Sequence, residues 1–151
     1  MTYVMAHAVP ASSTVAVPHG PAGVGGARRR MRSELTRAGA ADTAVDDAVL
    51  ILSELLSNAC RHARPIGADG AVRAHWALDA RGRITVAVTD GGGPTRPLPA
   101  SPSVTAHGGR GLAIIRSLAK DWGVDYGAGE VTVWAALPRR AEALYTADLA
   151  S

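Results

Sequence analysis

The chain has few of the residues that build cross-links, metal clusters or membrane spans. It contains one cysteine, Cys60, and no phenylalanine, and aromatic residues make up 4% of its 151 residues. A single cysteine excludes an internal disulfide and provides no cysteine cluster for a metal, which fits a reducing compartment. No basic segment precedes an apolar run at the N-terminus, and no window approaches the roughly 20 apolar residues of a spanning helix. We therefore expect a cytoplasmic protein with no membrane partner.

Length and composition predict one globular domain. A hydrophobic content of 47% over 151 residues is enough for a single core. Lys plus Arg exceed Asp plus Glu by 16 − 13 = 3, and Arg28, Arg29, Arg30, Arg32 and Arg37 lie close together. A solvated helix face is the simpler interpretation of this cluster, and a surface for an acidic partner is the alternative. Because no aromatic residues are interleaved, we expect no direct nucleic-acid binding.

The spacing of apolar residues predicts helices and antiparallel strands along the chain. We expect helices over 21–40, 45–63 and 110–120, and strands over 14–17, 71–78, 83–89, 122–126 and 131–137. Gly39 should stop the first helix, and Asp42 or Thr43 should cap the second. This order predicts an α+β fold, a two-layer sandwich. Residues 21–138 would form the domain, 1–20 an N-terminal strand and tail, and 139–151 a C-terminal tail.

The helical stretch 45–63 has two contrasting faces. Its apolar stripe, at three-and-four spacing, should face a core. On the opposite side, Leu50 and Ile51 lie beside Glu54 and Asn58, which are four residues apart and therefore neighbours. We expect this side to line a covered pocket, where a carboxylate and an amide oxygen suit a hard cation and a proton-abstracting base. A solvated polar patch is the alternative.

Two glycine-rich segments lie at the ends of predicted elements. Asp90 leads into DGGGP, where glycines let a flat ligand approach the backbone and the carboxylate can accept a hydrogen bond from an amine such as that of adenine. The segment GGRG, residues 108–111, precedes a helix whose free N–H groups suit phosphate, and Arg110 adds a charge-assisted contact. Each segment alone is also typical of an ordinary turn. The chain has no Walker-type phosphate loop, serine elbow or zinc motif.

Three motifs and a final strand follow one another over residues 53–138. They are SELLSNACRHA (53–63), VTDGGGP (88–94), HGGRGLAIIRSLAKDWGV (107–124) and EVTVWAALP (130–138). The first resembles the N box and the next two resemble the glycine boxes of the GHKL superfamily of ATP-binding domains. Gyrase, heat-shock chaperone, histidine kinase and mismatch-repair ATPases share this Bergerat fold. The short length and motif form look most like anti-sigma-factor serine/threonine kinases, and the resemblance implies a mixed, mostly antiparallel sheet covered on one face by helices.

The resemblance implies a nucleotide site built from all three motifs. Asn58 would coordinate Mg²⁺ bridging the phosphates of ATP, and Glu54 would be the catalytic base for the acceptor hydroxyl. Asp90 would bind the adenine amine, and Gly92 would shape its turn. The other implied nucleotide-binding residues are Arg61 near phosphate, Gly109, Arg110, Gly111 and Leu112 at the start of the later helix, and Thr132 near the adenine.

The resemblance also implies a function and partners. The protein would transfer the γ-phosphate of MgATP to Ser or Thr of an anti-anti-sigma (STAS-like) protein, and it would hold a sigma factor. Related kinases often form homodimers, so a homodimer is a candidate assembly. The loop 94–107 would be the ATP lid, closing over bound nucleotide.

The sequence departs from the family pattern in the lid. Pro94 stands in the place of the second glycine of the first glycine box, and the loop after it is rich in proline. A stiff lid disfavours catalysis at the phosphates more than it disfavours adenine binding. The alternative function is therefore a non-catalytic module whose affinity for a partner protein changes with bound nucleotide. The sequence shows no dimerisation helix with a phospho-acceptor histidine, which a complete sensor histidine kinase needs. His7, His19, His75 and His107 are expected to be superficial or incidental.

Overall fold

The computed structural model describes residues 10–63, 65–66, 70–92 and 113–139. The elements are β1 (Ala11–Pro18), α1 (Pro21–Arg37), α2 (Asp42–His62), β2 (Ala71–Leu78), β3 (Ile84–Asp90), β4 (Asp121–Gly127) and β5 (Glu130–Ala136). A short helix over 113–118 precedes β4. Every element expected in these ranges is present, with bounds that differ by a few residues. Among the described residues, every helix is too short or too polar to span a membrane.

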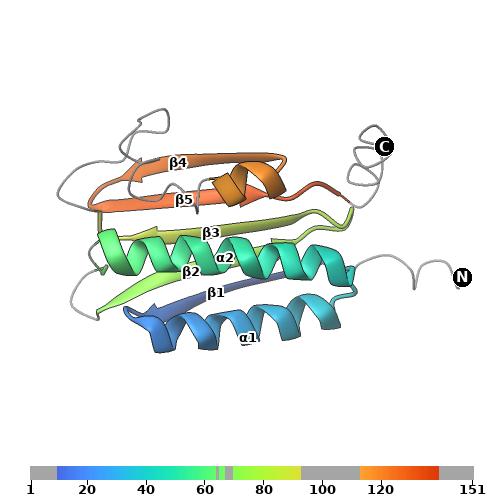
Figure 1. Cartoon of the computed structure of the whole chain (residues 1–151), viewed down its shortest axis with the longest axis horizontal. Coiled ribbons are helices and arrows are strands. Elements are labelled where there is room, and N and C mark those ends of the chain that lie inside the picture. The colour runs from blue at the N-terminus through green and yellow to red at the C-terminus, as the bar shows by residue number, and fades with distance from the viewer. Residues whose placement is uncertain (1–9, 64, 67–69, 93–112, 140–151) are drawn as a thin grey trace, which may run out of the picture.

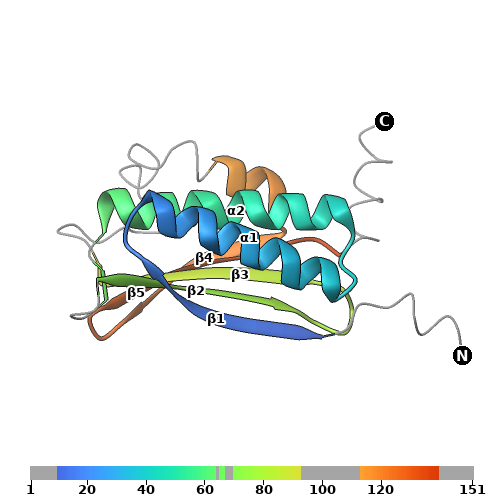
Figure 2. The ribbon, with the colours of Figure 1, turned by 90° about the horizontal axis from the view of Figure 1, so that it is seen from below.

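The five strands form one sheet in the order β1-β2-β3-β5-β4 (Figure 1). Each pairing in the described part of the sheet is antiparallel, where the expectation was a mixed, mostly antiparallel sheet. Seen from below, α1, α2 and the short helix 113–118 all lie on the same face of the sheet (Figure 2). The predicted α+β, two-layer sandwich is therefore confirmed.

Local side-chain chemistry fixes the hairpin between β2 and β3. The Asp79 carboxylate accepts hydrogen bonds from the N–H groups of Arg81 and Arg83, each at 2.9 Å. Gly82 has a φ of 85°, which glycine adopts without strain. The turn sets the register in which Leu78 pairs with Ile84 and Trp76 with Val86. All four of these side chains are buried, so the register brings the apolar halves of both strands to one face.

The core fills the space between the sheet and the two long helices. α1 contributes Met31 and Leu35, which are fully buried. α2 contributes a wider apolar face than the predicted stripe, because Ile51 is also fully buried and shares the hydrophobic cluster with Ile115 of the short helix. The prediction that Leu50 and Ile51 line one side together is wrong: Leu50 is 41% exposed. Because other helices pack on both flanks of α2, the buried surface of α2 is wider than the single predicted stripe.

The helix ends partly follow the expected signals. α1 ends at Arg37, and Gly39 follows with a φ of 92°, as expected for the stop. α2 begins at Asp42, and its N-cap is Ala41, with no side-chain capping hydrogen bond. The expectation that Asp42 or Thr43 caps α2 is therefore wrong, because both residues already lie within the helix. The expected lid 94–107 and the C-terminal segment 141–149 lie outside the described residues.

Candidate nucleotide-binding site

The C-terminal half of α2 carries the polar residues predicted from the N-box motif. Glu54 and Asn58, one turn apart on this helix, are both partly buried. The Arg61 guanidinium donates a long hydrogen bond of 3.4 Å to Asn58 Oδ1, and its Nε–H lies 3.4 Å from the carbonyl of Ser57. Arg61 is otherwise exposed, so its guanidinium can reorient toward an anion. The structure thus brings Arg61 to Asn58, as expected from helical spacing.

Asp90 is the last residue of β3 and the most deeply buried carboxylate of the site. It is 8% exposed and shares the sheet face of the core residues Val86 and Val88. Its Oδ1 accepts a hydrogen bond of 2.7 Å from the N–H of Gly92, which has a φ of 84°. In the described part of the chain, no side chain donates a hydrogen bond to this carboxylate. It therefore has acceptor capacity left for a ligand amine.

Burial raises the pKa of the Asp90 carboxyl above its ordinary value of 3.8. The hydrogen bond from Gly92 and the nearby imidazole of His19 act in the opposite direction, and burial outweighs both. A carboxylate in this environment is poorly hydrated. A hydrogen-bond donor supplied by a ligand would satisfy it better than the protein does.

His19 contacts the end of α2 and lies near Asp90, a place that the sequence did not predict. Its Nε2–H faces two carbonyl oxygens of the last turn of α2, at 3.3 Å from Ala59 and 3.1 Å from Ala63. Carbonyls at a helix C-terminus attract a donor such as this. His19 is also close enough to Asp90 to influence its pKa. The expectation that His19 is superficial or incidental is therefore wrong, and no local pattern around Pro18 signals this contact.

The structure does not bring Thr132 to the same side as Asp90. In the pairing of β3 with β5, Asp90 lies opposite Val131, and Thr89 lies opposite Thr132. Side chains alternate across a strand, so Thr132 points to the other face, where its hydroxyl lies 2.7 Å from that of Thr89. The expected place of Thr132 beside the adenine is corrected accordingly. Val131 occupies that side instead, with Cγ2 3.8 Å from where a Cβ on Gly92 would lie.

The remaining predicted residues lie outside the described part of the chain. These are Gly109, Arg110, Gly111 and Leu112, which were expected to bind phosphate at the start of the later helix. The described segment of that helix, 113–118, lies beside α2 (Figure 1). The fold thus brings the chain that follows the glycine segment to the helix that carries Glu54 and Asn58.

The donor set of the site fits a magnesium ion that is shared with phosphate. Within the described residues, no three or more His, Cys, Asp and Glu side chains group to hold a metal. Mg²⁺ bound with nucleotides takes one or two protein oxygens and completes its shell with phosphates and water. The amide oxygen of Asn58 meets that need, because the described residues give it one partner, the long hydrogen bond from Arg61.

Comparisons with known proteins concern the family and the fold of the chain. The family described as histidine kinase-like ATPase domain matches residues 17–137. The solved structure of the RsbU and RsbW domains of Rv1364c from Mycobacterium tuberculosis superposes with a TM-score of 0.64 and 21% identity. The match covers 85% of this chain and 32% of that chain, so this chain spans about a third of its length. At this identity the likeness concerns the fold alone. A search of curated proteins finds no match.

Proposed function

Because the chain belongs to the histidine kinase-like ATPase domain family, we propose that it binds MgATP between α2 and the end of β3 and phosphorylates a partner protein. The acceptor would be a Ser or Thr of an anti-anti-sigma protein, and a sigma factor would be the second partner. We place this activity in the cytoplasm, where ATP is available. The observation that carries the proposal is the buried Asp90 carboxylate, which keeps acceptor capacity beside the C-terminal end of α2.

Each residue of the site has one task in this proposal. Asp90 accepts a hydrogen bond from the adenine amine, and Gly92 allows the turn that exposes the Asp90 carboxylate. Asn58 holds the Mg²⁺, which neutralises charge on the phosphates. Arg61 leaves Asn58 and contacts phosphate. The segment 109–112 supplies backbone N–H groups to the phosphates.

Glu54 is the proposed base for the transfer step. It takes the proton of the acceptor hydroxyl as that oxygen forms a bond to the γ-phosphorus. The bond from the γ-phosphorus to the β–γ bridging oxygen breaks, and ADP leaves with its electron pair. Phosphoryl transfer depends mainly on positioning and charge neutralisation, so one carboxylate on a rigid helix is sufficient for the proton.

Calorimetric titration with a non-hydrolysable ATP analogue, with and without Mg²⁺, tests the site. Asp90→Ala should abolish binding, and Asn58→Ala should remove the gain that Mg²⁺ provides. Asp125→Ala is the control, because Asp125 is an exposed carboxylate on β4. Binding by Asp90→Ala equal to that of the unchanged protein would refute the site.

A second function, regulation without catalysis, is favoured by Pro94 in the place of a glycine. In this alternative, bound nucleotide changes affinity for the partner protein and no phosphate is transferred. Glu54→Gln separates the two functions. If it binds MgATP normally and loses phosphorylation of the partner by mass spectrometry, the kinase function holds. If the unchanged protein binds MgATP and its partner but transfers no phosphate, the regulatory function replaces it.

A further inference from the structure

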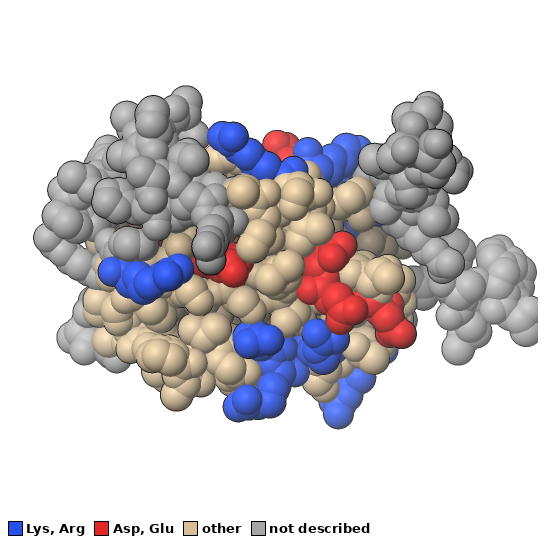
Figure 3. Space-filling model, in the orientation of Figure 1, with Lys and Arg blue, Asp and Glu red and all other residues tan. Residues whose placement is uncertain are grey.

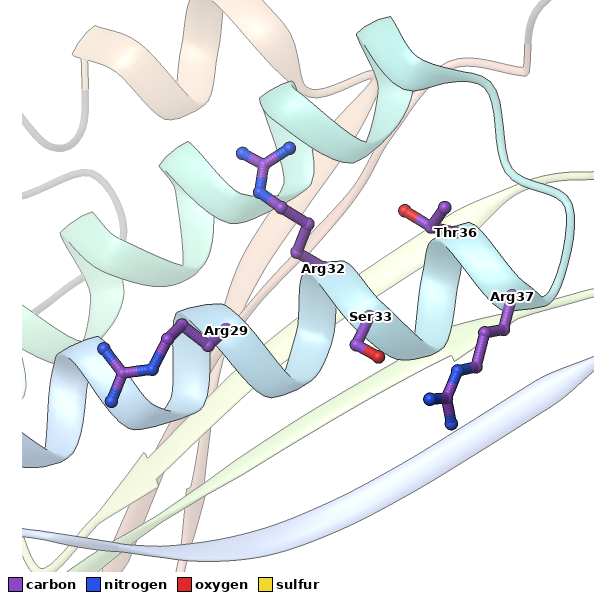
Figure 4. Close-up of a pocket in the computed structure, with 5 residues that line it drawn as sticks. All are labelled: Arg29, Arg32, Ser33, Thr36 and Arg37. Carbon is purple, nitrogen blue, oxygen red and sulfur yellow. The ribbon is translucent and has the colours of Figure 1, made fainter.

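The outer side of α1 carries a shallow hollow that the nucleotide site does not use. Five residues line it, and we call them the arginine face: Arg29, Arg32, Ser33, Thr36 and Arg37 (Figure 4). The hollow has a volume of about 470 Å³. The core residues Ala27, Met31 and Leu35 project from the opposite side of the same helix. The arginine face therefore does not pack against the sheet.

The charges of the arginine face are only partly balanced by the residues that the structure describes. Arg32 forms an ion pair of 2.8 Å with Asp46 of α2. For Arg29 and Arg37, no acidic side chain in the described ranges lies within ion-pair distance. Their Cα atoms lie about 12 Å apart along the helix axis, from eight residues at 1.5 Å each. Each of these two guanidinium groups, on backbone positions that the helix fixes, can bind a carboxylate through two hydrogen bonds.

The surroundings of the arginine face favour a protein ligand over a nucleic acid. In Figure 3 the basic side chains over α1 lie directly beside a group of acidic side chains over the N-terminal part of α2. α2 carries Asp42, Asp46 and Asp47 in this part. A continuous phosphate backbone that crossed both regions would be repelled by these carboxylates. A protein segment with a few acidic residues can match the basic region and avoid the acidic one.

The arginine face is separate from the nucleotide site. The Arg32–Asp46 pair fixes it beside the N-terminal half of α2, whereas His19 and Asp90 lie at the C-terminal end of α2. Figure 1 shows α1 and α2 running side by side, so the two surfaces lie toward opposite ends of the helix pair. A ligand on one surface therefore leaves the other accessible.

We propose that the arginine face docks an acidic segment of a partner protein, with carboxylates spaced about two helical turns apart on Arg29 and Arg37. Ser33 and Thr36 lie between these arginines and supply neutral hydroxyl contacts. This inference deepens the proposed function and rests on it, because the proposed function is what makes the partner a protein. The arginine face holds the partner, while the nucleotide site carries the chemistry.

A binding experiment with a defined acidic probe tests this proposal. The probe is a fluorescent helical peptide of about 20 residues with glutamates along one face. A control peptide carries glutamines at the same positions. Arg29→Gln combined with Arg37→Gln should weaken binding of the glutamate peptide by about tenfold or more at physiological salt. Arg81→Glu is the matched control, because it changes the net charge by the same two units at an exposed turn. It should leave binding within about twofold.

Three results would overturn the proposal. In the first, the unchanged protein binds the glutamate peptide no more tightly than the glutamine peptide. In the second, the double variant and Arg81→Glu lose the same affinity for the glutamate peptide. In the third, a single-stranded oligonucleotide or an anionic vesicle binds more tightly than the peptide, through Arg29 and Arg37. Titration of the ATP analogue runs in parallel, and both variants should bind it normally. If the unchanged protein binds no analogue, the nucleotide function fails, while the peptide result still decides the docking surface.

Discussion

Asp90 combines poor hydration with a single hydrogen bond from the described residues. Its carboxylate is buried at the end of β3, and burial raises its pKa above 3.8. A raised pKa means that the folded protein binds the proton more tightly than the unfolded chain does. The charged form therefore costs stability above this pKa, and the cost disappears as the pH falls through it. Such a cost is typical of a residue kept for its ligand.

Asp90→Asn should raise the unfolding temperature at pH 7 and weaken binding of the ATP analogue by about tenfold or more. The amide oxygen can still accept the hydrogen bond from Gly92, but the buried charge is gone. Thermal unfolding at pH 7 and at about pH 4 checks the sign, because the advantage of the variant should shrink as Asp90 becomes protonated. A stability difference that stays constant between the two pH values would contradict the assigned cause.

The environment of Glu34 lowers the pKa of its carboxyl, whereas that of Asp90 raises it. Burial raises its pKa, but hydrogen bonds from Ser13, Arg30 and Trp76 outweigh this and lower the pKa below 4.5. Trp76 is fully buried, and its indole N–H has this carboxylate as its partner at 3.1 Å. The carboxylate thus ties α1 to β1 and β2. This stabilisation is complete above pH 4.5 and is lost as the pH falls through the lowered pKa.

Glu34→Gln should lower the free energy of unfolding at pH 7 by about 1–2 kcal/mol, because three hydrogen bonds lose their charged acceptor. Chemical denaturation measures the difference, which should shrink below pH 4.5 as Glu34 itself becomes protonated. Glu130→Gln is the matched control, since its ion pair with Arg73 is more exposed. That control should cost less than about 1 kcal/mol. Equal losses in the two variants would mean that the network adds nothing beyond a surface pair.

At the scale of elements, the start of α1 depends on its close approach to β1. A Cβ on Gly23 would lie 2.4 Å from the backbone oxygen of Pro18, whereas a Cβ on Gly26 would meet nothing within 4 Å. Both glycines lie in the same helix. Alanine favours a helix over glycine by about 1 kcal/mol wherever there is room for its methyl group. The two positions therefore separate helix propensity from packing.

Gly26→Ala should stabilise the protein by about 0.5–1 kcal/mol. Gly23→Ala should destabilise it by about 1–3 kcal/mol, because the backbone of the β1–α1 turn must move to admit the methyl group. Thermal or chemical unfolding of the two variants gives both signs under the same conditions. Stabilisation by Gly23→Ala would show that β1 and α1 are less closely packed than the structure indicates.

The end of α2 depends on a histidine from the β1–α1 turn. His19→Ala removes the donor that faces the carbonyls of Ala59 and Ala63, and it should cost about 1 kcal/mol of stability. It should also weaken binding of the ATP analogue, because the last turns of α2 carry Asn58. His75→Ala is the control, since His75 pairs with Thr14 in the sheet. Unchanged affinity for the analogue in His19→Ala would limit His19 to a stabilising role.

At the scale of the whole molecule, the proposed nucleotide would bridge separate parts of the chain. α2 and the end of β3 would lie on either side of this nucleotide. His19 contacts carbonyls at the end of α2 and acts on the charge of Asp90 at the end of β3. A ligand held by both elements should therefore stabilise the whole fold. Stabilisation by a ligand follows its concentration relative to its dissociation constant.

An ATP analogue with Mg²⁺, at about 100 times its dissociation constant, should raise the free energy of unfolding by about 2.7 kcal/mol. Removal of Mg²⁺ with a chelator should reduce this gain at the same analogue concentration, because Asn58 then has no ion through which to hold the phosphates. Denaturant titrations in the three conditions provide the measurement. The same gain with and without Mg²⁺ would remove Asn58 from its proposed role.

Sequence patterns of short range determined much of the fold and part of the site. Alternation of apolar residues located β2 and β3, and helical spacing located α2 with Glu54 and Asn58 on neighbouring turns. Asp90 was placed at a strand end because glycines follow it directly. These features depend on residues within a few positions of one another, so the chain encodes them locally.

Only the tertiary structure decided which faces and which distant segments meet. Ile51 is buried because helices lie on both flanks of α2, and Thr132 points away from Asp90 because β5 pairs with β3 in one particular register. His19 reaches the end of α2 because β1 pairs with β2 far along the chain. The pairing of distant strands and the packing of helices depend on the whole core. A pattern within a single segment therefore cannot specify them.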